Sequence, residues 1–226
     1  MNLTRKSILL NILLAAAGLF FFAFGTYLTI QANIGVAPWD AFNLGLSNTF
    51  GIKYGSASIA VSLVIVVIDI LIREKIGISM LLDAILVGKF VDLFNFLGLV
   101  PKQTKLLVSI SIMIVGMIIM GFSQAMYMKA SLGSGPRDSL LVGLKRRTDK
   151  IPIGAISVAI LAAVTLIGWS LGGPIGIGTL ICAALVGPIM QLDFRLIRFD
   201  PTAVEHQNII ESIRILFSVS PEQADI

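Results

Sequence analysis

Residues 33–42 read NIGVAPWDAF, and residues 131–140 read SLGSGPRDSL. Both stretches place a Gly three positions before a Pro and an Asp two positions after it. Pro suits the first position of a helix because its missing N–H would have no partner there, and Asp in the first turn meets the positive end of the helix dipole. Gly permits a tight bend before the helix. Each stretch therefore predicts a turn that leads directly into a helix.

The chain around these turns is too apolar for a soluble protein. Of its 226 residues, 56% are hydrophobic and 13% are charged, and the mean hydropathy is +0.94. A soluble domain carries about 25% charged residues. Apolar runs close to the roughly 20 residues that cross a bilayer occupy residues 8–30, 56–72, 76–99, 106–128, 153–171 and 175–197. The sequence predicts an all-α, polytopic membrane protein with two further helices, at 38–50 and 136–144, that are too short to cross.

The two halves of the chain match each other. Beyond the turns, IGISMLLDAILVG from residue 76 aligns with IGIGTLICAALVG from residue 175 when one residue is inserted near Arg147. We interpret the chain as two homologous membrane repeats, 1–104 and 105–199, followed by a polar cytoplasmic tail, 200–226. The repeated turn residues, 98 positions apart, are Gly35 and Gly133, Pro38 and Pro136, and Asp40 and Asp138.

Two membrane topologies fit such repeats. If the short helices do not cross, each repeat crosses three times and the two repeats lie inverted in the membrane. If they do cross, each repeat crosses four times and the repeats lie parallel. The excess of basic residues in cytoplasmic loops barely separates these models, and the short length of 38–50 and 136–144 favours three crossings. We expect both termini in the cytoplasm.

The repeated turns supply the first candidate site. In one interpretation they only start helices. In the other, the short helices are re-entrant and their N-termini meet at a central cavity, as half-helices do in several transporters. Because the two aspartates offset the positive helix ends, a cationic or zwitterionic ligand is favoured over an anion. The candidate residues are Gly35, Pro38, Asp40, Gly133, Pro136 and Asp138.

The third apolar run supplies the second candidate site. Lys89 lies near its middle, where an ionisable residue is a functional candidate by default. Lys89 and Asp92 are three positions apart and share a helix face, so we expect them to pair, either structurally or as a coupling or gating pair. Asp83 lies nine positions before Asp92 and therefore on the opposite face.

Other kinds of chemistry find little support in the sequence. There is no nucleotide-binding loop, nucleophile elbow or pair of catalytic carboxylates, so we expect no enzyme, catalytic residue or cofactor. Cys182 and His206 are the sole cysteine and histidine, so we expect no disulfide and no metal site. The net charge of +4 reflects loop residues rather than nucleic-acid binding. In the tail, residues 204–217 predict a short amphipathic helix on the membrane edge or against a partner.

The turn ANIGVAPWDAF and the later IGISMLLDAILVGKFVDLF resemble the YitT/YczE-like integral membrane proteins of bacteria. The resemblance covers about residues 18–191 in two copies, and the second copy departs from it with Arg137 where the first has Trp39. It implies a protein of the bacterial plasma membrane and assigns no site residue.

From the repeated architecture we expect a secondary transporter or permease of a small solute or ion, driven by a proton or cation gradient. The alternative is a membrane scaffold that assists assembly of a partner without transport. The expected partners are the lipid bilayer, the solute, and a second copy or another protein that binds the tail.

Overall fold

The structure, a computed structural model, describes residues 5–148, 150–200 and 209. Every regular element in these residues is an α-helix, which confirms the all-α prediction. The predicted tail helix at 204–217 lies outside the described residues apart from Ile209. The helices are α1 (Arg5–Gln31), α2 (Pro38–Phe50), α3 (Tyr54–Leu71), α4 (Ile78–Leu97), α5 (Leu106–Lys129), α6 (Pro136–Arg147), α7 (Ile153–Ser170) and α8 (Ile177–Leu196).

The two short helices begin where the turns predict. A proline occupies the start of both α2 and α6, and Asp40 and Asp138 lie in the first turns. Helix α6 runs three residues beyond the predicted end at Leu144. The added residues are Lys145, Arg146 and Arg147, which form helices readily and are favoured in a last turn by the helix dipole.

Five helices are long and apolar enough to cross a membrane: α1, α3, α5, α7 and α8. The chain is therefore a multi-pass membrane protein. Helix α4 corresponds to the third predicted run, residues 76–99, and its 20 residues give it a spanning length of about 30 Å. It differs from the other five by carrying three charged residues, Asp83, Lys89 and Asp92.

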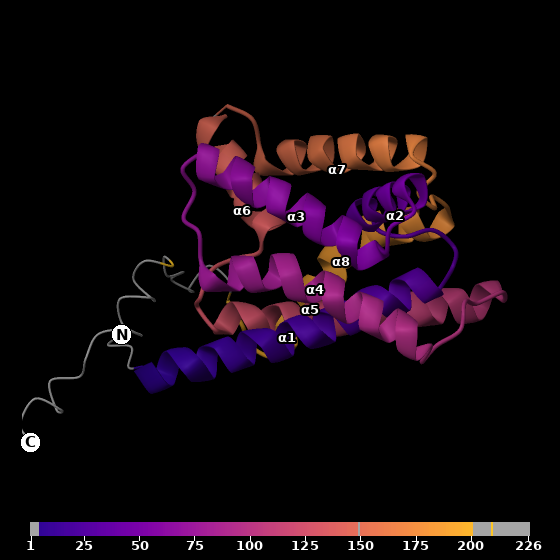
Figure 1. Cartoon of the computed structure of the whole chain (residues 1–226), viewed down its shortest axis with the longest axis horizontal. Coiled ribbons are helices and arrows are strands. Elements are labelled where there is room, and N and C mark those ends of the chain that lie inside the picture. Colours follow the sequence, from indigo (N-terminus) through magenta and orange to yellow (C-terminus); the bar gives the residue numbers. More distant parts are fainter. Residues whose placement is uncertain (1–4, 149, 201–208, 210–226) are drawn as a thin grey trace, which may run out of the picture.

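Helices α1 and α5 form the most extensive helix pair (Figure 1). They run antiparallel, since Gly18 faces Tyr127 while Gly25 faces Gly116. A Cβ atom on Gly25 would lie 2.6 Å from the carbonyl oxygen of Gly116, and one on Gly116 would lie 2.8 Å from that of Gly25. Small residues let two helices in a membrane approach this closely.

The other helices pack around this pair in a regular pattern. Helix α4 packs against α1 and α8 against α5, while α2 packs against α7 and α3 against α6. Between α1 and α4, Phe94 contacts the rings of Phe20, Phe24 and Tyr27. In Figure 1 the long helices follow a common direction, with α1 and α7 on opposite sides of the molecule.

We predict that Gly116→Leu destabilises the protein. The new side chain must displace the α1 backbone, and overpacking of this kind costs about 1–3 kcal/mol, or roughly 2–12 °C in unfolding midpoint for a chain of this size. Circular dichroism in detergent micelles measures the midpoint. Gly154→Leu on α7 is the control, because a Cβ at Gly154 has no atom within 4 Å. Equal midpoints for the two variants would contradict the packing described for α1 and α5.

Candidate functional site

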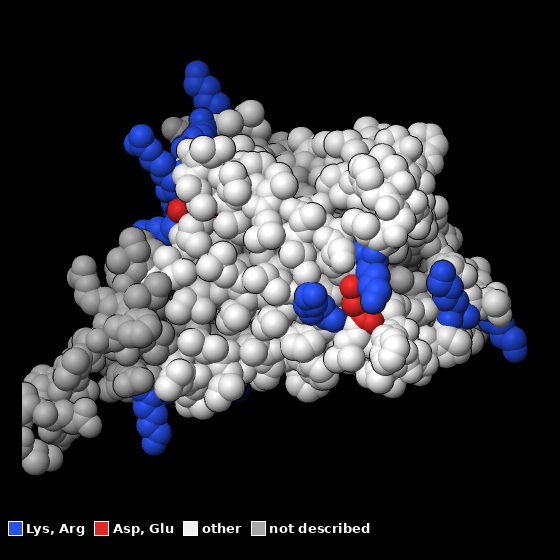
Figure 2. Space-filling model, in the orientation of Figure 1, with Lys and Arg blue, Asp and Glu red and all other residues white. Residues whose placement is uncertain are grey.

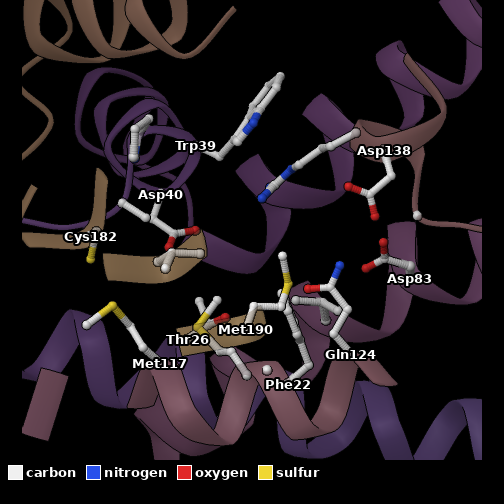
Figure 3. Close-up of a pocket in the computed structure, with 18 of the residues that line it drawn as sticks. Phe22, Thr26, Trp39, Asp40, Asp83, Met117, Gln124, Asp138, Cys182 and Met190 are labelled. Atoms are coloured by element: carbon white, nitrogen blue, oxygen red, sulfur yellow. The ribbon is translucent and has the colours of Figure 1, made fainter. Parts of the chain in front are cut away.

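A cavity of about 440 Å³ lies inside the bundle, and residues from all eight described helices line it (Figure 3). This volume falls in the range of about 300–1,000 Å³ that is typical of small-molecule sites. The first turns of α2 and α6 both reach the cavity: Pro38, Trp39 and Asp40 line it from α2, and Arg137 and Asp138 line it from α6. The cavity is therefore the place where the two repeated turns meet.

Two glycines and two backbone hydrogen bonds hold these turns in place. Gly35 has φ of 102° and Gly133 has φ of 121°, a backbone conformation that other residues rarely adopt. Next to Gly35, the carbonyl of Ile34 accepts a hydrogen bond of 2.7 Å from the N–H of Gly178 on α8. In the second turn, the N–H of Ser79 on α4 donates to the carbonyl of Leu132 at 3.0 Å. Each turn is thus fixed to the start of a long helix.

Asp40 is the most enclosed carboxylate of the cavity, with 4% of its surface exposed. The hydroxyl of Tyr54, at the start of α3, donates a hydrogen bond of 2.8 Å to Asp40 Oδ1. Oδ2 of Asp40 has no protein donor among the described residues. Figure 3 places Asp40 on the same side of the cavity as Cys182. One of its oxygens is therefore anchored and the other is left to the cavity.

A second acidic group lies across the cavity. Figure 3 shows the carboxylates of Asp83 and Asp138 facing each other, and the hydroxyl of Tyr127 lies beside Asp138. The guanidinium of Arg137 lies 5.0 Å from the ring centre of Trp39, within the range of a cation–π interaction. Arg137 acts electrostatically on the carboxylates without forming an ion pair within 4.0 Å in the described part of the chain.

The remaining wall of the cavity is mixed. Its apolar part is formed largely by Phe22, Met117, Met120, Val186 and Met190. Methionine side chains are flexible and polarisable, so such a wall adapts to ligands of different shape. The uncharged polar residues of the wall include Thr26, Ser58, Ser62, Gln124 and Ser157.

The structure separates the two candidate sites that the sequence suggests. Of the turn residues, Pro38, Asp40 and Asp138 line the cavity. The other three shape the turns instead: they are Gly35, Gly133 and Pro136.

Lys89 and Asp92 lie outside the cavity, and the ion pair expected between them is absent. Lys89 is exposed on α4. Asp92 instead accepts a hydrogen bond of 2.8 Å from the backbone N–H of Gly55 on α3. Asp83, on the opposite face of α4 as its spacing predicts, is the residue of that helix that reaches the cavity.

Sequence reasoning omitted four residues that shape the site. The spacing argument places Asp83 only relative to Asp92, although an aspartate within an apolar run is itself a signal. Trp39 and Arg137 occupy equivalent positions of the two predicted repeats. The difference between an aromatic residue in one and a cation in the other was the available signal for their contact. No sequence pattern indicated that Tyr54 would bind Asp40.

Comparison with known proteins shows the family. A model described as "Family of unknown function (DUF6198)" matches residues 9–193. The chain belongs to this family. It is 36% identical over 180 residues to the uncharacterized membrane protein YczE of Bacillus subtilis (strain 168), covering 77% of this chain and 81% of YczE. The YczE-like resemblance is thereby confirmed.

Two further relatives also come from bacteria. An uncharacterized protein of Haemophilus influenzae is 27% identical over 173 residues, covering 76% of this chain and 78% of that protein. The uncharacterized protein YyaS of Bacillus subtilis is 30% identical over 180 residues, covering 77% of this chain and 88% of YyaS. No solved structure matches the chain significantly.

We predict that Tyr54→Phe destabilises the protein because it removes the donor to a buried carboxylate oxygen. Leaving such an oxygen unsatisfied costs about 1–3 kcal/mol, which thermal unfolding in micelles detects. The control is the same change in an Asp40→Leu background, where no carboxylate remains and Tyr54→Phe should cost little. If Tyr54→Phe lowers the unfolding midpoint equally in both backgrounds, the hydrogen bond contributes nothing.

Proposed function

We propose that this protein is a secondary transporter of a small solute in the bacterial plasma membrane, and that the cavity is its solute site. The observation that carries the proposal is the cavity itself, because all the described helices line a space of ligand size and charged residues from α2, α4 and α6 converge on it. Ionisable residues inside a membrane protein mark substrate and ion pathways. The sequence holds no nucleotide-binding motif, so we infer that an ion gradient drives transport.

The transporter consists of two inverted repeats, 1–104 and 105–199, with the tail 200–226 following them. Recurring contacts support this division. Gly18 of α1 contacts Ser123 and Tyr127 of α5, and 98 positions later Gly116 of α5 contacts Gly25 and Thr29 of α1. Left-handed backbone conformations recur in the same way, at Asn33 and Ser131, at Gly35 and Gly133, and at Arg73 and Gly172.

The distribution of charge supports an orientation with both termini in the cytoplasm. Figure 2 shows most of the basic side chains at the two ends of the long helices, and a further group of basic and acidic side chains on the face between them. The end where α1 begins carries most of them, and the positive-inside rule makes this the cytoplasmic end. These residues include Lys6, Arg73, Lys75, Lys129, Lys145, Arg146, Arg147, Arg195 and Arg198, whereas Lys102 and Lys105 lie at the other end.

In this orientation each repeat crosses the membrane three times, and α4 is the sixth crossing helix. The direction of the chain supports α4 as a crossing helix: α4 packs antiparallel along α3 and returns to the end of the molecule where α1 finishes. There the N–H of Gln103, after α4, donates to the carbonyl of Gln31 at 2.9 Å. Helices α2 and α6 do not cross, and each runs from the cavity toward an end of the molecule.

The repeats differ at one place that bears on mechanism. In the first repeat, α3 packs along α4, and a Cβ on Gly88 would lie 2.7 Å from the carbonyl oxygen of Gly55. The equivalent positions of the second repeat, 99 residues later, are Gly154 and Gly187. A Cβ on either has no atom within 4 Å, and α7 and α8 make at most isolated contacts. We call α3–α4 the closed pair, because its helices are in contact, and α7–α8 the open pair, because its helices are not packed together.

Residues around the open pair suit movement. Asp92 ties α4 to the N–H of Gly55 in the closed pair, whereas its counterpart in the open pair, Gln191, is exposed. The counterpart of Lys89 is Pro188, inside α8. A proline inside a helix removes a backbone hydrogen bond and permits a kink. Helix α8 can therefore bend at a position where α4 has no proline.

We infer that transport alternates between these pairs. In the present conformation the cavity is accessible between α7 and α8 and closed between α3 and α4. In the opposite conformation α7 closes on α8 through Gly154 and Gly187, and α3 separates from α4. Exchange of conformations between inverted repeats around a fixed site is the general form of alternating access.

We predict that Gly154→Leu abolishes transport without unfolding the protein. The side chain fits the open pair but prevents its closure. Vesicles containing the pure protein are incubated with a mixed extract of small metabolites under a proton or sodium gradient, and their contents are compared by mass spectrometry. At least one solute should accumulate, and its uptake should fall at least tenfold in the variant.

The matched control is Ala163→Leu, which adds bulk to the exposed opposite face of α7, nine residues from Gly154. It should transport normally. Accumulation of no solute under gradients of either sign would refute transport and favour the membrane scaffold instead. Normal uptake by Gly154→Leu would refute the proposed closure of α7 on α8.

A further inference from the structure

We propose that the ligand of the cavity is a protonated amine: an organic cation with one positive charge, hydrogen-bond donors on its nitrogen and an apolar body. This inference rests on the proposed function in taking the cavity as the solute site, and it names the chemical class of the solute. Three independent properties of the lining carry it, namely charge balance, unsatisfied acceptors and apolar surface.

Counted with its three carboxylates ionised, the cavity has a formal charge balance of about −1. Three carboxylates line it, those of Asp40, Asp83 and Asp138, against the single guanidinium of Arg137. The N-termini of α2 and α6 also reach the cavity, and a helix N-terminus contributes roughly half a positive charge. The two helix ends and Arg137 together offset about two of the three carboxylates. A ligand with one positive charge neutralises the remainder.

Unpartnered acceptors in the wall point independently to a ligand with donor groups. Thr26, Ser58 and Ser62 are 2%, 3% and 6% exposed and line the cavity. No hydrogen bond within the described residues involves their hydroxyls, which face the cavity. Oδ2 of Asp40 likewise accepts no hydrogen bond from the described residues and can accept one from a ligand. Hydroxyl and carboxylate oxygens accept hydrogen bonds, and a primary or secondary ammonium supplies donors for them, which a quaternary ammonium does not.

The arrangement of the carboxylates favours an organic cation over a metal ion. In the residues that the structure describes, no three Asp, Glu, His or Cys side chains are placed to hold one metal ion. Asp40 lies across the cavity from the facing pair Asp83 and Asp138 (Figure 3). The space between them is bounded by Phe22, Trp39 and Met117 among others. A ligand that fills it needs apolar surface as well as charge.

Isothermal titration of the full-length protein in detergent micelles tests this class with compounds that share one frame. The probes are 3-phenylpropylammonium, 3-phenylpropanol and 3-phenylpropanoate, with trimethyl(3-phenylpropyl)ammonium as the cation that lacks donors. The expected order of affinity is ammonium, then quaternary ammonium, then alcohol, then carboxylate, with at least a tenfold difference between ammonium and alcohol. Equal or tighter binding of the alcohol or the carboxylate would overturn the proposal, as would an absence of ammonium binding.

Asp40→Asn tests whether the cavity is where the ammonium binds. It should weaken 3-phenylpropylammonium at least tenfold and leave 3-phenylpropanol unchanged. Glu74→Gln is the matched control, since it also replaces a carboxylate by an amide but lies outside the cavity, beside Arg146. An equal loss in both variants would overturn the assignment. Ammonium binding without uptake would refute transport alone, whereas uptake of neutral or anionic solutes without ammonium binding would refute the ligand class alone.

Discussion

The fold depends on a constraint at two buried turns, where the chain leaves a long helix and starts a short one. Such a turn exposes backbone carbonyls that must find donors inside the protein. The chain meets this need by exchange between halves: Gly178 donates to Ile34, and Ser79 donates to Leu132. Each half thereby supplies the donor that the turn of the other half requires. These bonds bring the first turns of α2 and α6 to one cavity.

The same pairing between halves explains how two similar halves can build one cavity, while the proposed access route runs between only one helix pair at a time. The turns and the α1–α5 pair contact across the halves in equivalent ways, so they form a frame that need not change. In the proposed mechanism, closure depends instead on contacts within each half. Glycine brings α3 onto α4 at Gly55 and Gly88, while the equivalent Gly154 and Gly187 face open space. Under the same proposal, a small adjustment of one helix pair changes access while the site keeps its residues.

The sequence predicted the local features of this structure better than its long-range contacts. The helix starts follow from Pro and Asp at fixed spacing, so the place of Asp40 in a short-helix N-terminus was predictable. Spacing also put Lys89 beside Asp92 on one helix face. It could not show that Asp92 would accept a hydrogen bond from the Gly55 N–H on α3 instead of pairing with Lys89. Likewise, no pattern within one repeat could bring Arg137 to the cavity, because its position depends on packing between the halves.

Disulfide formation between Gly154→Cys and Gly187→Cys, in a Cys182→Ser background, tests the central claim most directly. In the present conformation a Cβ at either position would meet no atom of another helix within 4 Å, but closure like that of Gly55 and Gly88 would bring the two positions within the roughly 4.4–6.8 Å Cα separation that a disulfide needs. The account predicts that oxidation of vesicles containing the protein cross-links the pair, and that uptake stops until the bond is reduced. Two cysteines that react with maleimide yet never cross-link would contradict it.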